Sequence, residues 1–313
     1  MTINNPILEH PGLKNNNLKS NLKLSWADSL ITQALTEDIG TGDITASLIS
    51  KDSKIQATVI TREPAVICGI FLVDEVFQRI DKNIKLNWKV SEGELVFEDT
   101  CLLEISGPAR GILTAERVAL NFLQFLSGTA TLTRAYVDAI LEVNSKTKLL
   151  DTRKTIPGFR LAQKYAVKVG GGENHRVGLY DAYLIKENHI ASCGGVIEAI
   201  KKANKLSSGE KIEIEIESIG QLEQILDNYK SQYLKLDIIM LDNFDIKMLK
   251  ESIKIRDEFF KSNLDLKPFF LEASGNMCLS NLSDVAETGV DYISVGSITK
   301  HVHAIDLSLR VKD

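Results

Sequence analysis

The sequence predicts an α/β protein in which a small sheet-containing half precedes a larger half of serial strand–helix units. Three observations support this prediction. Short β-rich runs separated by turn residues occur between residues 55 and 106. A long helical pattern follows over residues 113–141. After residue 147, apolar runs that end in polar residues recur every 24 to 35 residues, which is enough chain for one strand and one helix.

Composition limits the class of protein. The chain has 313 residues, 44% of them hydrophobic and 25% charged, so it can bury a sizeable core. Its formal net charge of −5 gives no cationic field for a polyanion, so a dedicated nucleic-acid binder is not expected. The longest apolar stretch, residues 65–73, is too short to span a membrane, and the first residues lack a signal-peptide pattern. The widely spaced cysteines are expected to be reduced thiols in a cytoplasmic protein: Cys68, Cys101, Cys193 and Cys278.

The N-terminal half begins with residues 1–24, which contain six Asn and two Pro without an apolar period and are expected to be flexible. From Trp26, apolar residues recur at helical spacing until a glycine-containing loop at residues 38–43. The sheet is predicted from strands at 57–61, 85–90 and 101–105, with a helix at 73–80. The helix over 113–141 then connects the halves, and Ser127-Gly128-Thr129 is expected to bend or split it.

Six strands are predicted in the C-terminal half. Their ends are marked by Asp151, Lys186, Glu215, Asp242, Glu272 and Gly296. Amphipathic helices are predicted between them over residues 196–206, 222–229, 246–260 and 279–288. A series of parallel strands of this kind forms an α/β barrel or a partial barrel. We prefer this fold to an open doubly wound sheet, because polar residues follow nearly every predicted strand. An open sheet would place its functional residues only at the strands that flank its switch point.

The run at residues 212–217 alternates isoleucine with glutamate, so Glu213, Glu215 and Glu217 share one face of the strand. In a barrel, the isoleucines contact the outer helices and the three carboxylates point into the lumen. Like charges in an apolar interior require a neutralising cation or metal. With Asp242 and Asn243 on the next strand end, they favour a site for a cation or a positively charged reacting centre. The alternative is an edge strand with its glutamates in water.

Residues 151–190 carry seven Lys or Arg against four Asp or Glu, which makes this segment the expected anion-binding region. The cations at strand ends or in glycine-flanked loops, where they can converge on one ligand, are Arg153, Lys154, His175, Arg176 and Lys186. The planar guanidinium group suits a carboxylate. The alternative for the Arg153 and Lys186 side chains is a structural ion pair with the glutamates. Lys164 and Lys168, four residues apart on a predicted helix, are expected to be solvated.

Two turns of small residues follow the last two strands, at residues 273–276 and 295–299. Glycine lets backbone N–H groups approach a phosphate, and the helices expected to start near Met277 and Thr299 add a favourable dipole. Together the turns predict a phosphate site at the last two strand ends.

Eight sequence blocks occur in the order found in quinolinate phosphoribosyltransferases, and the chain from about Trp26 to its C-terminus resembles this family. The blocks lie at residues 37–45, 114–117, 151–158, 170–176, 184–188, 240–244, 271–275 and 295–299. The resemblance implies a pentosyltransferase that joins quinolinate to 5-phosphoribosyl 1-diphosphate (PRPP) with Mg²⁺. The products would be diphosphate, CO₂ and nicotinate mononucleotide for NAD biosynthesis.

The fold implied by this resemblance is an N-terminal α/β sandwich followed by a partial, TIM-like α/β barrel. The expected parts are the flexible extension 1–24, the sandwich domain 25–130 and the barrel catalytic domain 131–300. A C-terminal helix over 301–313 is expected to return to the N-terminal domain. The resemblance also implies a homodimer or a larger homo-oligomer whose active site borrows from the neighbouring subunit.

The resemblance assigns roles to particular residues. Quinolinate would be bound by Arg153, His175, Arg176 and Lys186, with Arg117 reaching in from the partner subunit. Lys154 would lie near the diphosphate, and Glu215 and Asp242 near the ribose and Mg²⁺, directly or through substrate or water. The 5-phosphate would be held by Ser274, Gly275, Asn276, Gly296 and Ser297. The expected catalytic residues are Glu215, Asp242, Lys154 and Lys186. His303 stands where arginine is common in the family.

The charges suit this chemistry. Departure of diphosphate from C1 of the ribose builds an oxocarbenium-like cation, which Glu215 and Asp242 can stabilise. The pyridine nitrogen then attacks without a general base, and the pyridinium formed promotes loss of CO₂ while cationic side chains hold the carboxylates.

Three alternatives remain. The same framework acts on another base in nicotinate phosphoribosyltransferases and in the related molybdenum-locus proteins. Lys186 could instead be the Schiff-base lysine of a barrel aldolase, although a neighbouring Glu215 would keep it charged. A non-catalytic protein that binds a phosphorylated sugar is the third alternative, and the many lumen charges argue against it.

Overall fold

The computed structural model describes residues 16–143, 146–232 and 234–312. The chain divides into two compact units. The first contains the described residues up to Arg134, together with Ile156–Gly171 and those from Val302 onward, and the second contains Ala135–Thr155 and Gly172–His301. The expected domains differ from these units mainly at residues 156–171, which belong to the first unit rather than to the barrel. Within the described residues, no helix combines the length and the apolar character needed to cross a membrane.

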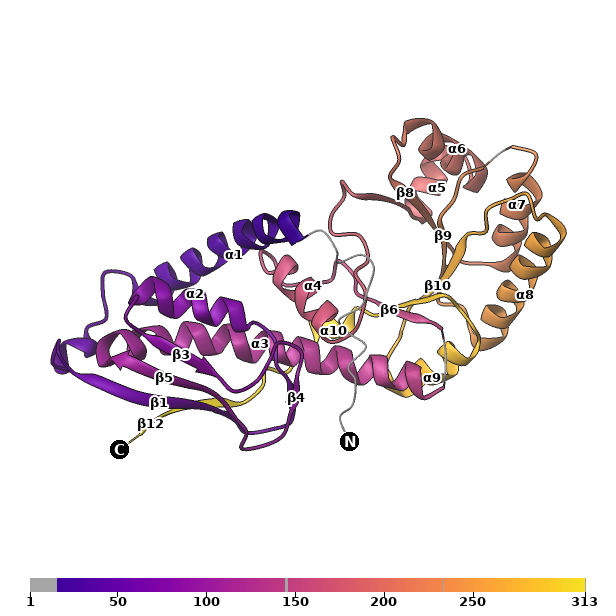
Figure 1. The fold of residues 1–313 in the computed structure, drawn as a ribbon. Coiled ribbons are helices and arrows are strands. Elements are labelled where there is room, and N and C mark those ends of the chain that lie inside the picture. Colours follow the sequence, from indigo (N-terminus) through magenta and orange to yellow (C-terminus); the bar gives the residue numbers. More distant parts are fainter. Residues whose placement is uncertain (1–15, 144–145, 233, 313) are drawn as a thin grey trace. The chain divides into compact units, whose positions relative to one another are not determined.

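The first unit contains an antiparallel sheet of order β12-β1-β5-β3 (Figure 1). Its strands are β1 (Lys54–Thr61), β3 (Lys85–Trp88), β5 (Cys101–Pro108) and β12 (Leu307–Val311). A separate antiparallel pair is formed by β2 (Ala65–Val66) and β4 (Leu95–Val96). The helical elements are α1 (Asn16–Ile39), the 3₁₀ helix η3 (Thr45–Leu48), α2 (Ile70–Ile80), α3 (Ala109–Glu142) and α4 (Arg160–Val169).

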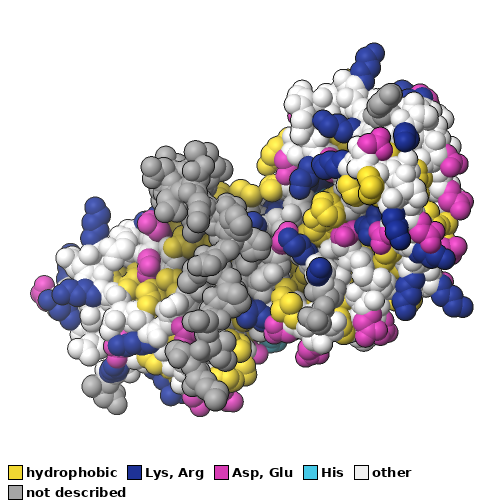
Figure 2. Space-filling model, turned by 45° about the vertical axis from the view of Figure 1, so that its right-hand side comes forward, with side chains coloured by type: hydrophobic (Ala, Val, Ile, Leu, Met, Phe, Trp, Pro, Cys, Tyr) yellow, Lys and Arg dark blue, Asp and Glu magenta, His cyan; other side chains and the backbone are white. Residues whose placement is uncertain are grey.

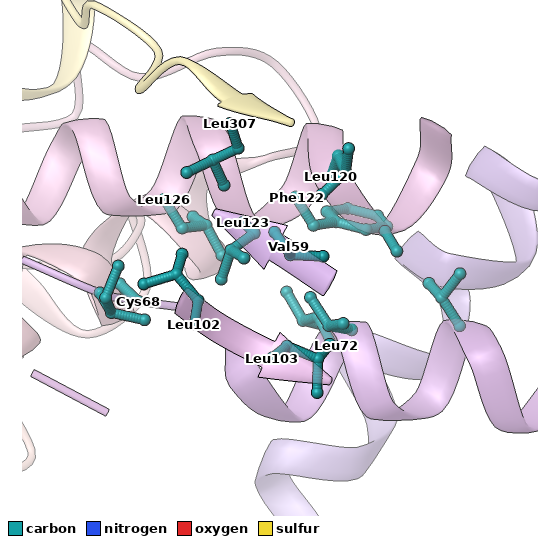
Figure 3. Close-up of a cluster of buried hydrophobic side chains, with 14 of the residues drawn as sticks. Val59, Cys68, Leu72, Leu102, Leu103, Leu120, Phe122, Leu123, Leu126 and Leu307 are labelled. Carbon is teal, nitrogen blue, oxygen red and sulfur yellow. The ribbon is translucent and has the colours of Figure 1, made fainter. Parts of the chain in front are cut away.

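The core of the first unit forms between this sheet and helices α2 and α3. Strand β1 buries alternate residues, Ala57, Val59 and Thr61, as a strand with one face on a core requires. Figure 3 shows the buried side chains that meet there, among them Val59, Leu72, Leu102, Leu103, Leu123, Leu126 and Leu307. The cluster therefore joins segments from both ends of the chain.

Both chain ends differ from the sequence prediction. Helix α1 begins at Asn16, so residues 16–24 of the expected flexible extension are helical, while residues 1–15 lie outside the described residues. Residues 307–311 form strand β12 instead of the expected C-terminal helix, and the strand pairs with β1 from Thr61↔Leu307 to Ala57↔Val311. Its apolar residues Leu307 and Leu309 alternate with polar ones, which is the period of a strand. The chain end thus returns to the N-terminal sheet.

Helix α3 runs without interruption through Ser127-Gly128-Thr129, contrary to the bend or split expected there. Gly128 has a packing role instead, because a Cβ atom at this position would lie 2.0 Å from the carbonyl oxygen of His303. The absence of a side chain therefore lets the segment that leads to β12 cross the helix closely.

Replacing Gly128 by alanine is expected to destabilise the protein by about 1 to 3 kcal/mol, because backbone must move to relieve the contact. Gly220, on helix α7 (Ile219–Tyr229), provides a control, since a Cβ atom there meets nothing within 4 Å. Gly220→Ala is expected to be neutral or slightly stabilising, as alanine favours a helix. Thermal unfolding of both variants tests the prediction, and equal melting temperatures would contradict it.

Lys164 is buried in helix α4, with 3% of its surface exposed, whereas Lys168 is exposed as expected. The prediction that both are solvated was therefore wrong for Lys164. Helix α4 buries Ala162, Gln163, Ala166 and Val167 as well. This buried face is wider than a single amphipathic stripe, so a spacing of four residues does not decide which lysine reaches water.

The second unit contains a parallel sheet of order β6-β11-β10-β9-β8-β7. Its strands are β6 (Lys148–Leu150), β7 (Ala182–Ile185), β8 (Lys211–Ile216), β9 (Ile238–Asp242), β10 (Phe270–Ser274) and β11 (Tyr292–Ser294). Its other helices are α5 (Glu187–Cys193), α6 (Val196–Leu206), α8 (Ile246–Ser262), α9 (Leu279–Glu287) and α10 (Ser297–Lys300). The six predicted strands and the four predicted amphipathic helices are all present.

The sheet does not close into a full barrel. Among the described residues, β6 and β7 are the two edges of the sheet and do not pair with each other. This arrangement agrees with the predicted partial barrel and not with a complete TIM barrel. On the visible face of the second unit, at the right of Figure 2, Lys and Arg side chains are interspersed with Asp and Glu. That face therefore shows no broad basic patch among the described residues.

Candidate active site

Strand β8 places two glutamates on the lumen side of the sheet. Glu213 and Glu215 are 3% and 8% exposed, and β8 lies between β7 and β9. The alternative of an edge strand with solvated glutamates is therefore wrong. Glu217 lies beyond the end of β8 and is exposed, so the predicted row of three lumen carboxylates has two members. The strand ends before the alternation of the sequence does.

Lys186, directly after β7, forms an ion pair with Glu215. Burial raises the pKa of Glu215, the Lys186 ammonium opposes this shift, and repulsion from Asp242 adds to it. Lys186, Glu215 and Asp242 therefore form one electrostatic group at the ends of β7, β8 and β9. The pairing argues against the aldolase alternative, because a Schiff-base lysine must be uncharged to attack a carbonyl.

His175 lies between two buried carboxylates. Its Nε2 atom is 2.9 Å from Glu213 Oε2 and 3.7 Å from Glu272 Oε2, while its Nδ1 accepts a hydrogen bond from the Arg176 N–H. The remaining ring proton therefore lies on Nε2, facing the carboxylates. The ligand atoms of His175, Glu213 and Glu272 all lie within 4.8 Å of one another, so this group could also hold a metal ion.

Glu272 is fully buried on β10. Burial, followed by repulsion from Glu213, raises its pKa to about 8, and the neighbouring His175 opposes the shift. The folded protein therefore keeps the Glu272 proton up to about pH 8, whereas the unfolded chain releases it near the ordinary value of 4.5. Since the native state binds the additional proton between these values, stability falls as pH rises through this range.

Glu272→Gln, which carries no such proton, is expected to remove this pH dependence. Relative to the wild type, the variant should gain stability from pH 5 to pH 9 by up to about 4 kcal/mol, so the difference is most favourable to the variant at pH 9. Urea unfolding at pH 5, 7 and 9 measures the effect, with Glu287→Gln on the exposed side of α9 as control. A stability difference between Glu272→Gln and the wild type that does not change with pH would contradict the raised pKa of Glu272 as its cause.

Asp151, at the end of β6, organises the loop that carries His175. The side chain is fully buried, and its oxygens accept hydrogen bonds from Asn174 Nδ2 at 2.6 Å and from the His175 N–H at 2.9 Å. Sequence reasoning used Asp151 and Glu272 as strand markers and missed their place in the site. The alternation of side chains along β10 could have placed Glu272 in the site. Its neighbours Leu271 and Ala273 are buried on one face of the strand, so Glu272 points to the other face.

Arg153 and Arg176 lie close enough to repel each other. Burial lowers the pKa of Arg176, and repulsion from Arg153 lowers it further, while Glu213 and Asp181 oppose the shift. The Arg176 guanidinium also donates to the Ala182 carbonyl at 3.2 Å. Two guanidinium groups held close together, with the buried Glu213 nearby, form a binding place for a ligand with negative charge.

The two predicted phosphate turns lie at neighbouring strand ends, after β10 and β11. Gly275 has φ of 92°, and Gly296 packs against Lys154, whose Cδ would lie 3.0 Å from a Cβ atom at position 296. Ser297 Oγ lies 3.1 Å from the Tyr136 hydroxyl, with which it forms a hydrogen bond. Because its stem packs against Gly296, the exposed Lys154 side chain lies at the second turn. The helices after the turns begin at Leu279 and Ser297, and the second has four residues.

Arg117 is the one predicted site residue in the first unit, where its side chain is exposed on α3. The other predicted site residues, from Arg153 to Ser297, belong to the second unit and lie at or after the carboxyl ends of its strands. His303 is exposed in the first unit.

Comparison with protein families gives two matches that together cover most of the chain. Residues 43–127 match the N-terminal domain of quinolinate phosphoribosyl transferase, and residues 129–310 match its C-terminal domain.

Individual relatives extend over most of the chain. The rice (Oryza sativa subsp. japonica) protein named nicotinate-nucleotide pyrophosphorylase [carboxylating], chloroplastic, is 38% identical over an alignment 298 residues long, gaps included, which covers 90% of this chain and 77% of the relative. A Bacillus subtilis protein with the name probable nicotinate-nucleotide pyrophosphorylase [carboxylating] is 37% identical and covers 90% of this chain and 92% of its own. The solved structure of the nicotinate-nucleotide pyrophosphorylase from Francisella tularensis has a TM-score of 0.84 and 45% identity, covering 99% of this chain and 100% of its own.

Proposed function

The chain belongs to the quinolinate phosphoribosyltransferase family, and we propose the following assignment of its residues to the reaction of that family. The enzyme is a carboxylating nicotinate-nucleotide pyrophosphorylase, a pentosyltransferase of NAD biosynthesis. It transfers the phosphoribosyl group of PRPP to quinolinate with release of diphosphate and CO₂. The observation that carries the assignment is the contact between cationic and acidic side chains at the carboxyl ends of the parallel strands, which we call the rim. The ion pair of Lys186 and Glu215 is the example.

Quinolinate occupies the cationic side of this rim. Its two carboxylates require more than one positive group, and the nearby guanidinium groups of Arg153 and Arg176 together with the Lys186 ammonium meet this need. His175 accepts a hydrogen bond from the Arg176 N–H and in this way orients the cationic side of the rim. Holding both carboxylates aligns the pyridine nitrogen with C1 of the ribose.

PRPP occupies the acidic side and the two glycine turns. Glu215 and Asp242 face the position where positive charge develops on the ribose as the diphosphate departs. Lys154, whose stem lies against Gly296, neutralises the departing diphosphate. The 5-phosphate is bound by Ser274, Gly275 and Asn276 of the first turn and by Gly296 and Ser297 of the second. After attack by the nitrogen, the carboxylate next to it leaves as CO₂. The electron pair of the broken bond stays on the ring carbon, where the adjacent pyridinium nitrogen stabilises it, and that carbon then takes up a proton from water.

Mg²⁺ fits the same acidic side. Carboxylate oxygens are ligands that Mg²⁺ prefers, and it is commonly held by one or two carboxylates together with substrate phosphates. Burial is the main cause of the raised pKa of Glu215, and repulsion from Asp242 adds to it; a cation would relieve this repulsion. When bound, Mg²⁺ would neutralise charge on the diphosphate, with Glu215 and Asp242 holding it directly or through substrate or water.

A homodimer or larger homo-oligomer is proposed to complete the site, with Arg117 supplied to quinolinate by the neighbouring subunit. Support comes from the exposure of this arginine on α3 and from its place in a different unit from the other site residues. A cytoplasmic location is also proposed, supported by the four free cysteines.

The proposed function is tested by incubating the protein with quinolinate labelled in its carboxyl groups, PRPP and Mg²⁺. Labelled CO₂ and nicotinate mononucleotide are expected, and both should depend on all three additions. A reaction with nicotinate but not with quinolinate would instead identify a related transferase for another base. Loss of activity on chelation, with recovery on added Mg²⁺, tests the metal.

A further inference from the structure

We infer that Asn243 is a positioning residue that connects the 5-phosphate turn to Asp242, so that both ends of the PRPP site form together. The inference rests on the proposed placement of PRPP. Asn243 directly follows β9, and its side chain makes two hydrogen bonds in opposite directions. Its Nδ2 donates to Asp242 Oδ2 at 2.7 Å, and its Oδ1 accepts from Asn276 Nδ2 at 3.2 Å.

The donor and acceptor roles in these two hydrogen bonds are determined by the groups at their outer ends, Asp242 and Asn276. The Asp242 carboxylate can only accept when ionised, and the Asn276 amide nitrogen can only donate. An asparagine between them satisfies both, with its nitrogen toward Asp242 and its oxygen toward Asn276. Aspartate at position 243 would satisfy the Asn276 end alone and would place a second carboxylate beside Asp242.

Backbone geometry brings the Asn243 side chain over the turn. Asn243 has φ of 57° and Asn276 has φ of 50°, a left-handed conformation that asparagine tolerates better than most residues. The Asn243 N–H donates to the Ser274 carbonyl at 2.9 Å, which extends the β9–β10 pairing by one residue. The amide then lies directly against Gly275, because a Cβ atom there would be 2.2 Å from Asn243 Oδ1.

The far side of the turn is held by helix α9. Asn281 Nδ2 donates to the Asn276 carbonyl at 3.1 Å, and Asn281 Oδ1 accepts from the Cys278 N–H at 2.9 Å. Residues 274–278 are thus held between α9 and Asn243. Of these two supports, Asn243 alone also contacts Asp242, which the proposed function places at the ribose end of the same substrate.

Asn243→Gly is the informative variant, because glycine accepts the positive φ and removes both side-chain hydrogen bonds. Its affinity for PRPP, measured by calorimetry without quinolinate, is expected to fall about 10-fold, as expected for two hydrogen bonds of modest net strength. The KM for PRPP should rise by a similar factor, while the KM for quinolinate changes less than about twofold. Asn243→Asp should weaken PRPP binding at least as much.

Asn263→Gly is the matched control. Asn263 directly follows helix α8, as Asn243 follows β9, and its side chain also makes hydrogen bonds, including one from Nδ2 to the Phe259 carbonyl at 2.9 Å. This variant should retain both KM values. Unchanged PRPP affinity in Asn243→Gly, or equal increases of both KM values, would overturn the positioning role. Failure of the wild-type protein to release CO₂ from quinolinate would instead reject the proposed function, and PRPP affinity would still decide the role of Asn243.

Discussion

Replacing Glu215 by glutamine is expected to lower kcat by about 10²- to 10³-fold, because the developing positive charge on the ribose loses a nearby carboxylate. Glutamine preserves the size of the side chain and an oxygen that can accept from Lys186, so the change is mainly one of charge. The KM for PRPP should rise much less than kcat falls, since the ground-state sugar carries no such charge. Steady-state kinetics with saturating quinolinate and Mg²⁺ measures both constants.

Glu217→Gln is the control for this variant, since it makes the same change on an exposed residue of the same segment. Its kinetic constants should be those of the wild type. Because the pKa of Glu215 is raised, wild-type kcat should decline as pH falls through this pKa, and the Glu215→Gln variant should lack this limb. An effect confined to KM would contradict the assigned role.

Replacing Arg153 by alanine is expected to weaken quinolinate binding by about 100-fold, with a smaller change in kcat. The variant removes one of two adjacent guanidinium groups and leaves a substrate carboxylate without its partner, at a cost of about 2 to 5 kcal/mol. Calorimetric titration with quinolinate measures the loss of affinity directly, and the KM for PRPP should remain near the wild-type value.

Two further variants sharpen this test. Arg153→Lys retains the charge without the planar fork and should recover only part of the affinity. Lys168→Ala removes a positive charge from the exposed side of α4, so its quinolinate affinity should equal that of the wild type. The same affinity in Arg153→Ala and in Lys168→Ala would show that Arg153 is not a quinolinate ligand.

Local periodicity is the reason why much of the second unit could be predicted. The alternation of Ile and Glu in β8 depends only on neighbouring residues, and it correctly placed Glu213 and Glu215 on the lumen side. Helix α6 spans Val196–Leu206, the range that its amphipathic pattern predicts. The same reasoning was wrong where the surroundings override the local pattern, as at Lys164, at Gly128 and in the C-terminal strand β12.

The sequence by itself determined the order of strands and helices, the family, and the set of polar residues that follow the strands. Tertiary structure decided which of these residues meet. His175 faces Glu213 and Glu272 although nearly a hundred residues separate the first and last of them, and Lys186 reaches Glu215 across two strand ends. The physical reason is that side-chain period is a property of each strand alone, whereas contacts between strand ends depend on sheet register and on loops such as the one held by Asp151.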